Sequence, residues 1–152
     1  KKDVLRALKL INQFGKHFDV ILGLNEKEAH EVAKALDIDA PAKTPEALAE
    51  LATAIFKRVP VQTLVVHPVS YALAVGADGV SMVLGPTTDK RLITTGAGDH
   101  FNSGFCMGKL LGLDNAQSLL CGVTTSGFYV RTAKSPAVAD LAKMLKNKAI
   151  KY

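Results

Sequence analysis

Short, uninterrupted runs of aliphatic and β-branched residues constrain the fold of this chain more than any other feature. Such runs are typical of strands that are buried on both faces. Two occur in the first half, at residues 18–24 and 63–66, and segments with helical spacing of apolar residues separate them. Strands that alternate with helices usually pair in parallel. We therefore expect an α/β sheet whose interior strands are parallel.

The other elements are expected from periodicity and from residues that begin or end a helix. Thr44 suits an N-cap and Pro45 a first helical position. A loop is expected at residues 37–44, which include Pro41, and a hairpin turn at residues 76–79. The expected hairpin strands are residues 71–75 and 80–84, and the expected helices are residues 4–14, 25–36, 45–58, 98–111, 115–130 and 136–148.

Composition limits the class of protein. The 152 residues suffice for one domain, and 48% hydrophobic with 22% charged residues excludes a disordered chain. No apolar run approaches the roughly 20 residues that a membrane helix needs. The net charge is +5, but the basic residues do not alternate with aromatic ones, so nucleic-acid binding is not expected. Cys106 and Cys121 lie in apolar stretches and are expected to be buried free thiols, which fits a cytoplasmic protein.

The strongest chemical signal is a cluster of small residues where a helix is expected to begin. Residues 94–99 read Thr-Thr-Gly-Ala-Gly-Asp. The N–H groups in the first turn of a helix have no partner within the helix, so they attract anions such as phosphate. Asp99 would lie beside such an anion and could accept a proton. The residues alone also allow an ordinary glycine turn, whereas Phe101 disfavours a dinucleotide-binding loop because it replaces the last glycine of that motif.

Residues 94–105 resemble the second signature of the ribokinase (PfkB) family of carbohydrate kinases, which runs Asp-Thr-x-Gly-Ala-Gly-Asp into a helix. Asn25-x-x-Glu28, at the end of an expected strand, resembles the family's Asn-x-x-Glu motif, and residues 127–136 extend the similarity. The resemblance implies a three-layer αβα sheet with mainly parallel strands. Residues 1–152 would be a single segment of that domain, the C-terminal, nucleotide-side half, without the N-terminal half and the lid. We interpret the chain as a fragment, with a natural half-protein as the alternative.

The resemblance also implies an activity, the ATP-dependent phosphorylation of a hydroxymethyl group on a sugar or a related small molecule. Asp99 would be the catalytic base. The backbone N–H groups of Gly96, Ala97 and Gly98 would form the anion hole for the γ-phosphoryl group. Positioning and charge stabilisation are the main needs of phosphoryl transfer, so this arrangement is chemically reasonable.

The remaining implied contacts concern the nucleotide and its metal ion. Asn25 and Glu28 would help to hold Mg²⁺ through water next to the ATP phosphates, since Mg²⁺ prefers oxygen ligands and retains water. Thr95, Thr124 and Thr125 would contact the nucleotide. Helix capping by Asn25 and Glu28, and packing by Thr124 and Thr125, are the alternatives.

Two departures from the family pattern favour a second hypothesis, a non-catalytic nucleotide-binding or regulatory member of the same fold. Ile93 replaces the aspartate that begins the signature, which argues against activation by a monovalent cation. His67 and Pro68 stand where relatives have a glycine-containing nucleotide loop. His100, directly after Asp99, is expected on a helix surface. The expected partner is a sugar-like small molecule, with no nucleic acid and no membrane, and the complete protein could be a homodimer.

Overall fold

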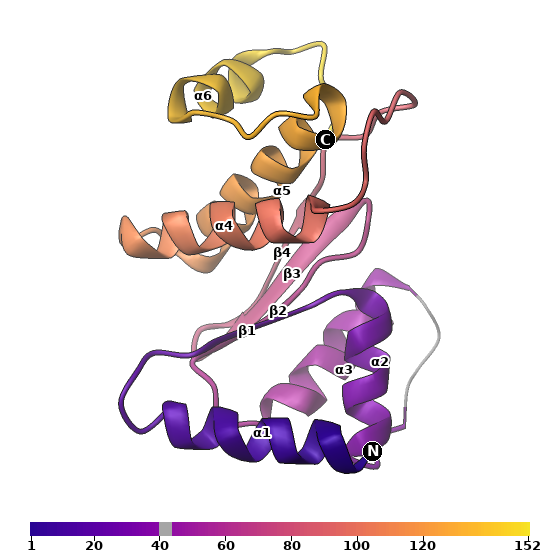
Figure 1. Cartoon of the computed structure of the whole chain (residues 1–152), viewed down its shortest axis with the longest axis vertical. Coiled ribbons are helices and arrows are strands. Elements are labelled where there is room, and N and C mark those ends of the chain that lie inside the picture. Colours follow the sequence, from indigo (N-terminus) through magenta and orange to yellow (C-terminus); the bar gives the residue numbers. More distant parts are fainter. Residues whose placement is uncertain (40–43) are drawn as a thin grey trace. The chain divides into compact units, whose positions relative to one another are not determined.

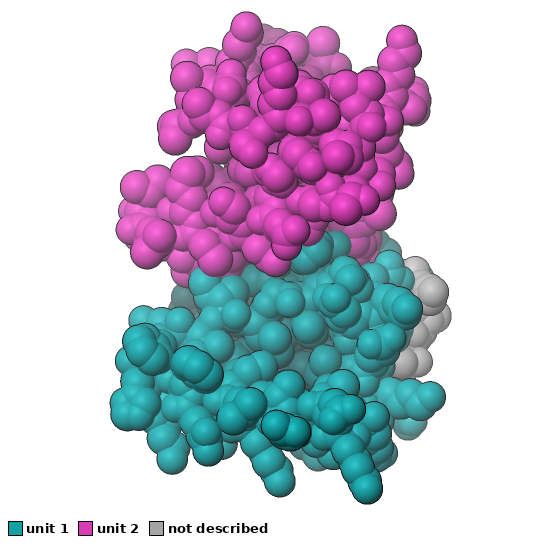
Figure 2. Space-filling model, viewed as in Figure 1, with its two compact units in different colours: residues 1–67, 73–81 teal, residues 68–72, 82–152 magenta. Residues whose placement is uncertain are grey.

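The computed structural model describes residues 1–39 and 44–152, so Pro41 of the expected loop lies outside the described residues. The chain divides into two compact units (Figure 2). Unit 1 comprises residues 1–67 and 73–81, and unit 2 comprises residues 68–72 and 82–152.

The helices and strands follow the expected order (Figure 1). The first half contains α1 (Lys2–Phe14), β1 (Ile21–Leu24), α2 (Glu26–Ala35), α3 (Pro45–Phe56) and β2 (Thr63–Val66). These elements are followed by β3 (Tyr71–Gly76), β4 (Gly79–Leu84), α4 (Ala97–Leu110), α5 (Asn115–Thr132) and α6 (Val138–Lys146). The expected elements are therefore confirmed in type, while their ends shift by a few residues. The largest shift is in β1, because Phe18, where the strand was expected to begin, is exposed.

The four strands form one sheet in the order β1-β2-β3-β4. Strands β1 and β2 are parallel, with Ile21 opposite Thr63, whereas β2 and β3 are antiparallel, with Leu64 opposite Val75. The prediction of mainly parallel strands is therefore wrong for these residues, and the sheet is mixed. The reason is the connection between β2 and β3: only residues 67–70 join them, which is far too short for the crossover that a parallel pair requires.

The core of unit 1 lies where α2 and α3 pack against β1 and β2. Every residue of β2 is buried. Helix α3 begins as expected, because the Thr44 hydroxyl accepts a hydrogen bond from the N–H of Ala47 and Pro45 occupies the first turn. The buried face of α3 consists of Leu48, Leu51, Ala52 and Ile55.

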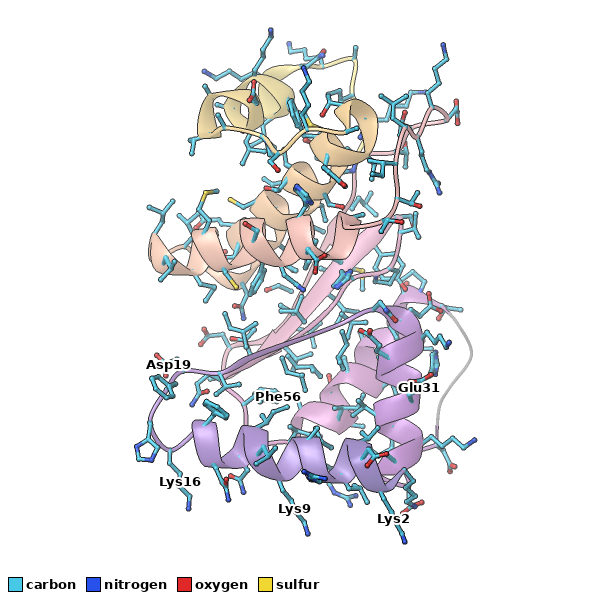
Figure 3. All side chains as sticks on the ribbon, in the orientation of Figure 1. Lys2, Lys9, Lys16, Asp19, Glu31 and Phe56 are labelled. Carbon is cyan, nitrogen blue, oxygen red and sulfur yellow. The ribbon has the colours of Figure 1, made fainter. Side chains whose placement is uncertain are left out.

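Helix α1 contributes no buried residue to unit 1. Its basic side chains are exposed, and Figure 3 shows Lys2 and Lys9 extending away from the helix, as does Lys16 shortly after its end. The basic residues of α1 thus lie on its exposed surface. Among the described residues, no helix is both long and apolar enough to cross a membrane.

Unit 2 is built on the packing of α4 along α5. Their close approach depends on Gly104, where a Cβ atom would overlap the Thr125 side chain and lie 2.7 Å from the carbonyl oxygen of Cys121. The buried residues of α4 are Phe101, Gly104, Phe105 and Gly108.

The expectation that both cysteines are buried is wrong. Both are free thiols, but Cys106 is exposed and Cys121 is only partly buried. Cys106 lies outside the buried stripe of α4 because that stripe follows the three-to-four-residue spacing of one helix face. Partial burial raises the pKa of the Cys121 thiol, which lowers its reactivity at neutral pH.

Candidate functional site

The start of α4 has the geometry of an open helix N-terminus. Gly96 is the N-cap residue in a left-handed conformation (φ 86°, ψ 0°), and no side chain caps the helix there. The N–H of Ala97 donates to the carbonyl oxygen of Thr94 at 3.1 Å, which closes a tight turn. A positive φ favours glycine at position 96, so the motif and the backbone conformation agree.

The first turn of α4 leaves hydrogen-bond donors available. In the described part of the chain, the N–H groups of Gly98 and Asp99 donate to no protein acceptor. The positive end of the helix dipole lies at the same place. The Asp99 side chain is exposed, and no described residue forms a hydrogen bond or ion pair with its carboxylate. This arrangement can bind an anion and offers a free carboxylate next to it.

Two side chains of unit 2 contact the backbone carbonyl groups of this turn. The Tyr129 hydroxyl of α5 donates to the carbonyl oxygen of Thr95 at 3.0 Å. Nδ1 of His100 lies 2.8 Å from the carbonyl oxygen of Gly96, and the His100 and Tyr129 rings stack with centroids 3.6 Å apart. His100 was expected on a helix surface, and its ring is only partly buried, but both of its nitrogens have hydrogen-bond partners.

Sequence reasoning missed this pair for different reasons. The four-residue spacing between Gly96 and His100, which brings the ring over the helix start, was a usable signal. Tyr129 gave none, because its contact depends on the packing of α5 against α4.

The three threonines expected at the nucleotide differ in their surroundings. Thr95 is exposed at the turn. Thr124 and Thr125 are buried in α5, with relative exposures of 0% and 6%. The Thr124 hydroxyl lies 3.4 Å from the Tyr152 hydroxyl, and the Thr125 hydroxyl donates to the carbonyl oxygen of Cys121 at 2.8 Å.

The start of α2, in unit 1, is closed by its own side chains. The Asn25 side chain accepts a hydrogen bond from the N–H of Glu28, and the Glu28 carboxylate accepts one from the N–H of Asn25, both at 2.8 Å. This reciprocal capping box is a common way to begin a helix. It follows directly from the Asn-x-x-Glu spacing, so capping alone explains why these two residues occur together.

The residues at the start of α2 are nevertheless compatible with a hydrated magnesium ion. Glu28 has one carboxylate oxygen that is not engaged in the capping box, whereas the single side-chain oxygen of Asn25 is engaged and has one lone pair left. Among the described residues there is no cluster of three or more acidic, histidine or cysteine side chains that could hold a metal ion directly. Contact through water, which the family resemblance implies for Mg²⁺, is compatible with these residues.

His67 lies at the end of β2, where its N–H donates to the carbonyl oxygen of Leu24 at 3.0 Å. Burial lowers the pKa of the His67 imidazole below its ordinary value, and the Glu28 carboxylate acts in the opposite direction. His67 therefore belongs to the surroundings of the α2 N-terminus.

The structure brings the sequence-predicted residues together in two groups. Gly96, Ala97, Gly98 and Asp99 form the start of α4 in unit 2, and Asn25 and Glu28 form the start of α2 in unit 1.

Comparison with known proteins decides the family. The pattern of the family described as prokaryotic ketohexokinase matches residues 1–148 of the 152. The chain belongs to this ketohexokinase family. The ketohexokinase of Haloferax volcanii is 29% identical over 122 residues, which are 80% of this chain and 31% of that protein. The resemblance to the ribokinase (PfkB) carbohydrate kinases is thereby confirmed.

Solved structures of ribokinase-like proteins share the fold of this ketohexokinase-family chain. Ribokinase from Arabidopsis thaliana, complexed with ribose and ATP, has a TM-score of 0.71 at 19% identity and matches 84% of this chain and 41% of its own. Ribokinase from Thermotoga maritima has a TM-score of 0.70 at 21% identity, with 88% and 44% matched. The nucleoside kinase from Methanocaldococcus jannaschii has a TM-score of 0.69 at 19% identity, with 95% and 45% matched.

The ketohexokinase-family chain thus spans about a third of the curated relative and less than half of these solved chains. Family and fold are established by the comparisons, as a partial ribokinase-like α/β fold with a mixed sheet.

Proposed function

We propose that this chain carries the phosphoryl-transfer part of an ATP-dependent kinase, which phosphorylates a hydroxymethyl group of a ketohexose or a related sugar. Membership of the ketohexokinase family and the name of the Haloferax volcanii relative support the substrate class. The observation that carries the proposal is the uncapped start of α4, with free N–H donors and the exposed carboxylate of Asp99 in one helical turn.

Asp99 would act as the base. Its carboxylate accepts the proton of the sugar hydroxyl while that oxygen forms a bond to the γ-phosphorus, the bond from phosphorus to the bridging oxygen breaks, and ADP leaves. The N–H groups of Gly96 and Gly98 stabilise the charge on the transferred group. Ala97 would join this anion hole by sharing its N–H between the Thr94 carbonyl and a phosphoryl oxygen, as bifurcated bonds at helix ends do.

Asn25 and Glu28 would orient water molecules around Mg²⁺, which supplies charge neutralisation at the ATP phosphates when bound. Thr95 is the most accessible of the proposed nucleotide contacts. Thr124 and Thr125 would support the nucleotide side of α5 chiefly by packing, because their hydroxyls have partners inside unit 2.

The proposal applies to the complete protein, since the matched relatives are much longer than this chain. A three-layer αβα sheet, of which these residues form the C-terminal, nucleotide-side half, belongs to the same proposal. So do a cytoplasmic setting, a sugar-like partner and a homodimeric assembly.

The test is an Asp99→Asn variant of the complete protein. We expect turnover to fall by about 10²–10⁴-fold, the usual contribution of a general base, while binding of Mg-ATP is retained. Asp89→Asn is the matched control, because Asp89 is exposed in the loop before α4 and forms no ion pair among the described residues. Equal turnover of the two variants would contradict the role of Asp99.

A non-catalytic nucleotide-binding or regulatory protein is the second candidate. His67 and Pro68 in place of a glycine-containing loop, and Ile93 in place of aspartate, favour it. Calorimetry of the complete protein with Mg-ATP, together with a ketohexose phosphorylation assay, separates the candidates. Binding without turnover would favour the second, and turnover would exclude it.

A further inference from the structure

Two stacked rings hold the turn that precedes α4. The Tyr129 hydroxyl donates to the carbonyl oxygen of Thr95, and Nδ1 of His100 lies 2.8 Å from the carbonyl oxygen of Gly96. The planes of the two rings are 11° apart. A Cβ atom on Gly96 would lie 3.3 Å from the Tyr129 hydroxyl, so the tyrosine also packs against the backbone of the turn.

The hydrogen-bond partners of the His100 ring indicate which of its nitrogens carries the proton. The carbonyl oxygen of Gly96 can only accept, so Nδ1 must carry a proton. In a neutral ring Nε2 is then an acceptor, which suits the Ser135 hydroxyl at 2.9 Å. The same Gly96 carbonyl accepts the backbone N–H of His100 at 3.1 Å, so one residue occupies both lone pairs of that oxygen.

These bonds have a consequence for the opposite side of the turn. The peptide bond between Thr95 and Gly96 is trans, so its carbonyl and its N–H point in opposite directions. When Tyr129 holds the Thr95 carbonyl, the N–H of Gly96 is directed away from the tyrosine. We propose that Tyr129 and His100 are positioning residues that hold the Thr95–Gly96 turn so that its N–H donors face the transferred phosphoryl group.

This proposal rests on the proposed kinase function, and its test uses the complete protein. Tyr129→Phe keeps the stacked ring and removes only the bond to Thr95. His100→Leu removes both ring hydrogen bonds, whereas His100→Asn restores a donor near the place of Nδ1. We expect Tyr129→Phe to lower kcat about tenfold and His100→Leu about 10²-fold, with KM for both substrates nearly unchanged, because misplaced donors affect the transition state more than substrate binding. His100→Asn should recover part of the loss.

Thr53→Val is the matched control for Tyr129→Phe. It also deletes a hydroxyl that donates to a backbone carbonyl, that of Ala49 at 2.8 Å, but it lies in α3 of unit 1. The control should lose thermal stability without losing kcat per folded molecule. The same result for Tyr129→Phe and His100→Leu would overturn the positioning role. If Asp99→Asn is equally active, the kinase proposal itself fails.

A second measurement does not depend on turnover. Titration with inorganic phosphate, followed by the amide NMR signals of Gly96, Gly98 and Asp99, reports the donors directly. We expect these signals to shift in the wild-type protein and to need at least several-fold more phosphate in Tyr129→Phe. Identical titrations, or no shift in the wild type, would overturn the proposal.

Discussion

The starts of α2 and α4 are two helix N-termini of opposite character. At α2, Asn25 and Glu28 satisfy one another's backbone N–H groups in a reciprocal box. At α4, a left-handed glycine occupies the N-cap and no side chain caps the helix. The first arrangement stabilises its own helix, whereas the second leaves donors for a ligand. This contrast supports the expectation that the backbone at the start of α4, rather than that at the start of α2, binds an anion.

The largest effect is expected when the open end of α4 is distorted. Gly96→Ala forces a side chain into a conformation with φ 86° and against Tyr129. We expect a stability loss of about 1–2 kcal/mol from the backbone strain. We also expect turnover of the complete protein to fall by about 10²-fold or more, as when one donor of an oxyanion hole is lost.

Gly79→Ala is the matched control for this prediction, because Gly79 also has a positive φ of 98° but an added Cβ would have no atom within 4 Å. Denaturant titration should show a comparable loss of stability in both variants. Retained turnover in Gly96→Ala, corrected for folded fraction, would mean that the open helix start is not used in catalysis.

A smaller effect is expected at the closed end of α2. Glu28→Gln keeps an oxygen acceptor for the N–H of Asn25, so the free energy of unfolding should change by no more than about 0.5 kcal/mol. If the carboxylate orients water around Mg²⁺, the concentration of Mg²⁺ needed for half-maximal activity should rise about tenfold.

The variants Asn25→Ala and Asp114→Ala separate the capping role of Asn25 from its proposed role in Mg²⁺ binding. Each removes a capping box, at α2 and at α5 respectively, and each should cost about 1 kcal/mol of stability. Only Asn25→Ala should change the Mg²⁺ dependence. An unchanged Mg²⁺ dependence in both Asn25→Ala and Glu28→Gln would leave capping as the whole role of the motif.

The smallest effect is the pH dependence of stability near the start of α2. Burial lowers the pKa of His67 in the folded state below 6.5, so the unfolded chain binds a proton more readily than the folded chain does. The free energy of unfolding is therefore not reduced by this group above pH 6.5, where His67 is neutral in both states. It declines as the pH falls below that value, until His67 is protonated in the folded state as well. Urea titrations between pH 5 and 8 should show this slope in the wild type, and a weaker one in His67→Asn. Equal slopes would assign the pH dependence to other groups.

The local sequence was sufficient to predict the structure wherever the interactions that determine it join residues within one helical turn of each other. The Asn25-x-x-Glu28 spacing produces a capping box, Thr44 and Pro45 begin α3, and the glycine at position 96 adopts the positive φ that the turn requires. Local sequence also indicated the residues of the proposed anion hole and the proposed base, Asp99. The reason is that the start of a helix is built from residues that are neighbours in the sequence. Their chemical roles stay predictions.

Contacts between distant segments decided the rest. The exposure of Cys106 depends on which face of α4 meets α5. The burial of Thr125, which lies against Gly104, and the stacking of Tyr129 on His100 depend on the same helix pair. The antiparallel pairing of β3 is different, because its cause is local: the connection of residues 67–70 is too short for a crossover. The sequence by itself determined the elements, their starts and the chemical groups at the start of α4. Only the tertiary structure decided which side chains contact the backbone of that turn. The reason is that packing brings together residues about thirty positions apart in the sequence, and no local spacing predicts such a contact.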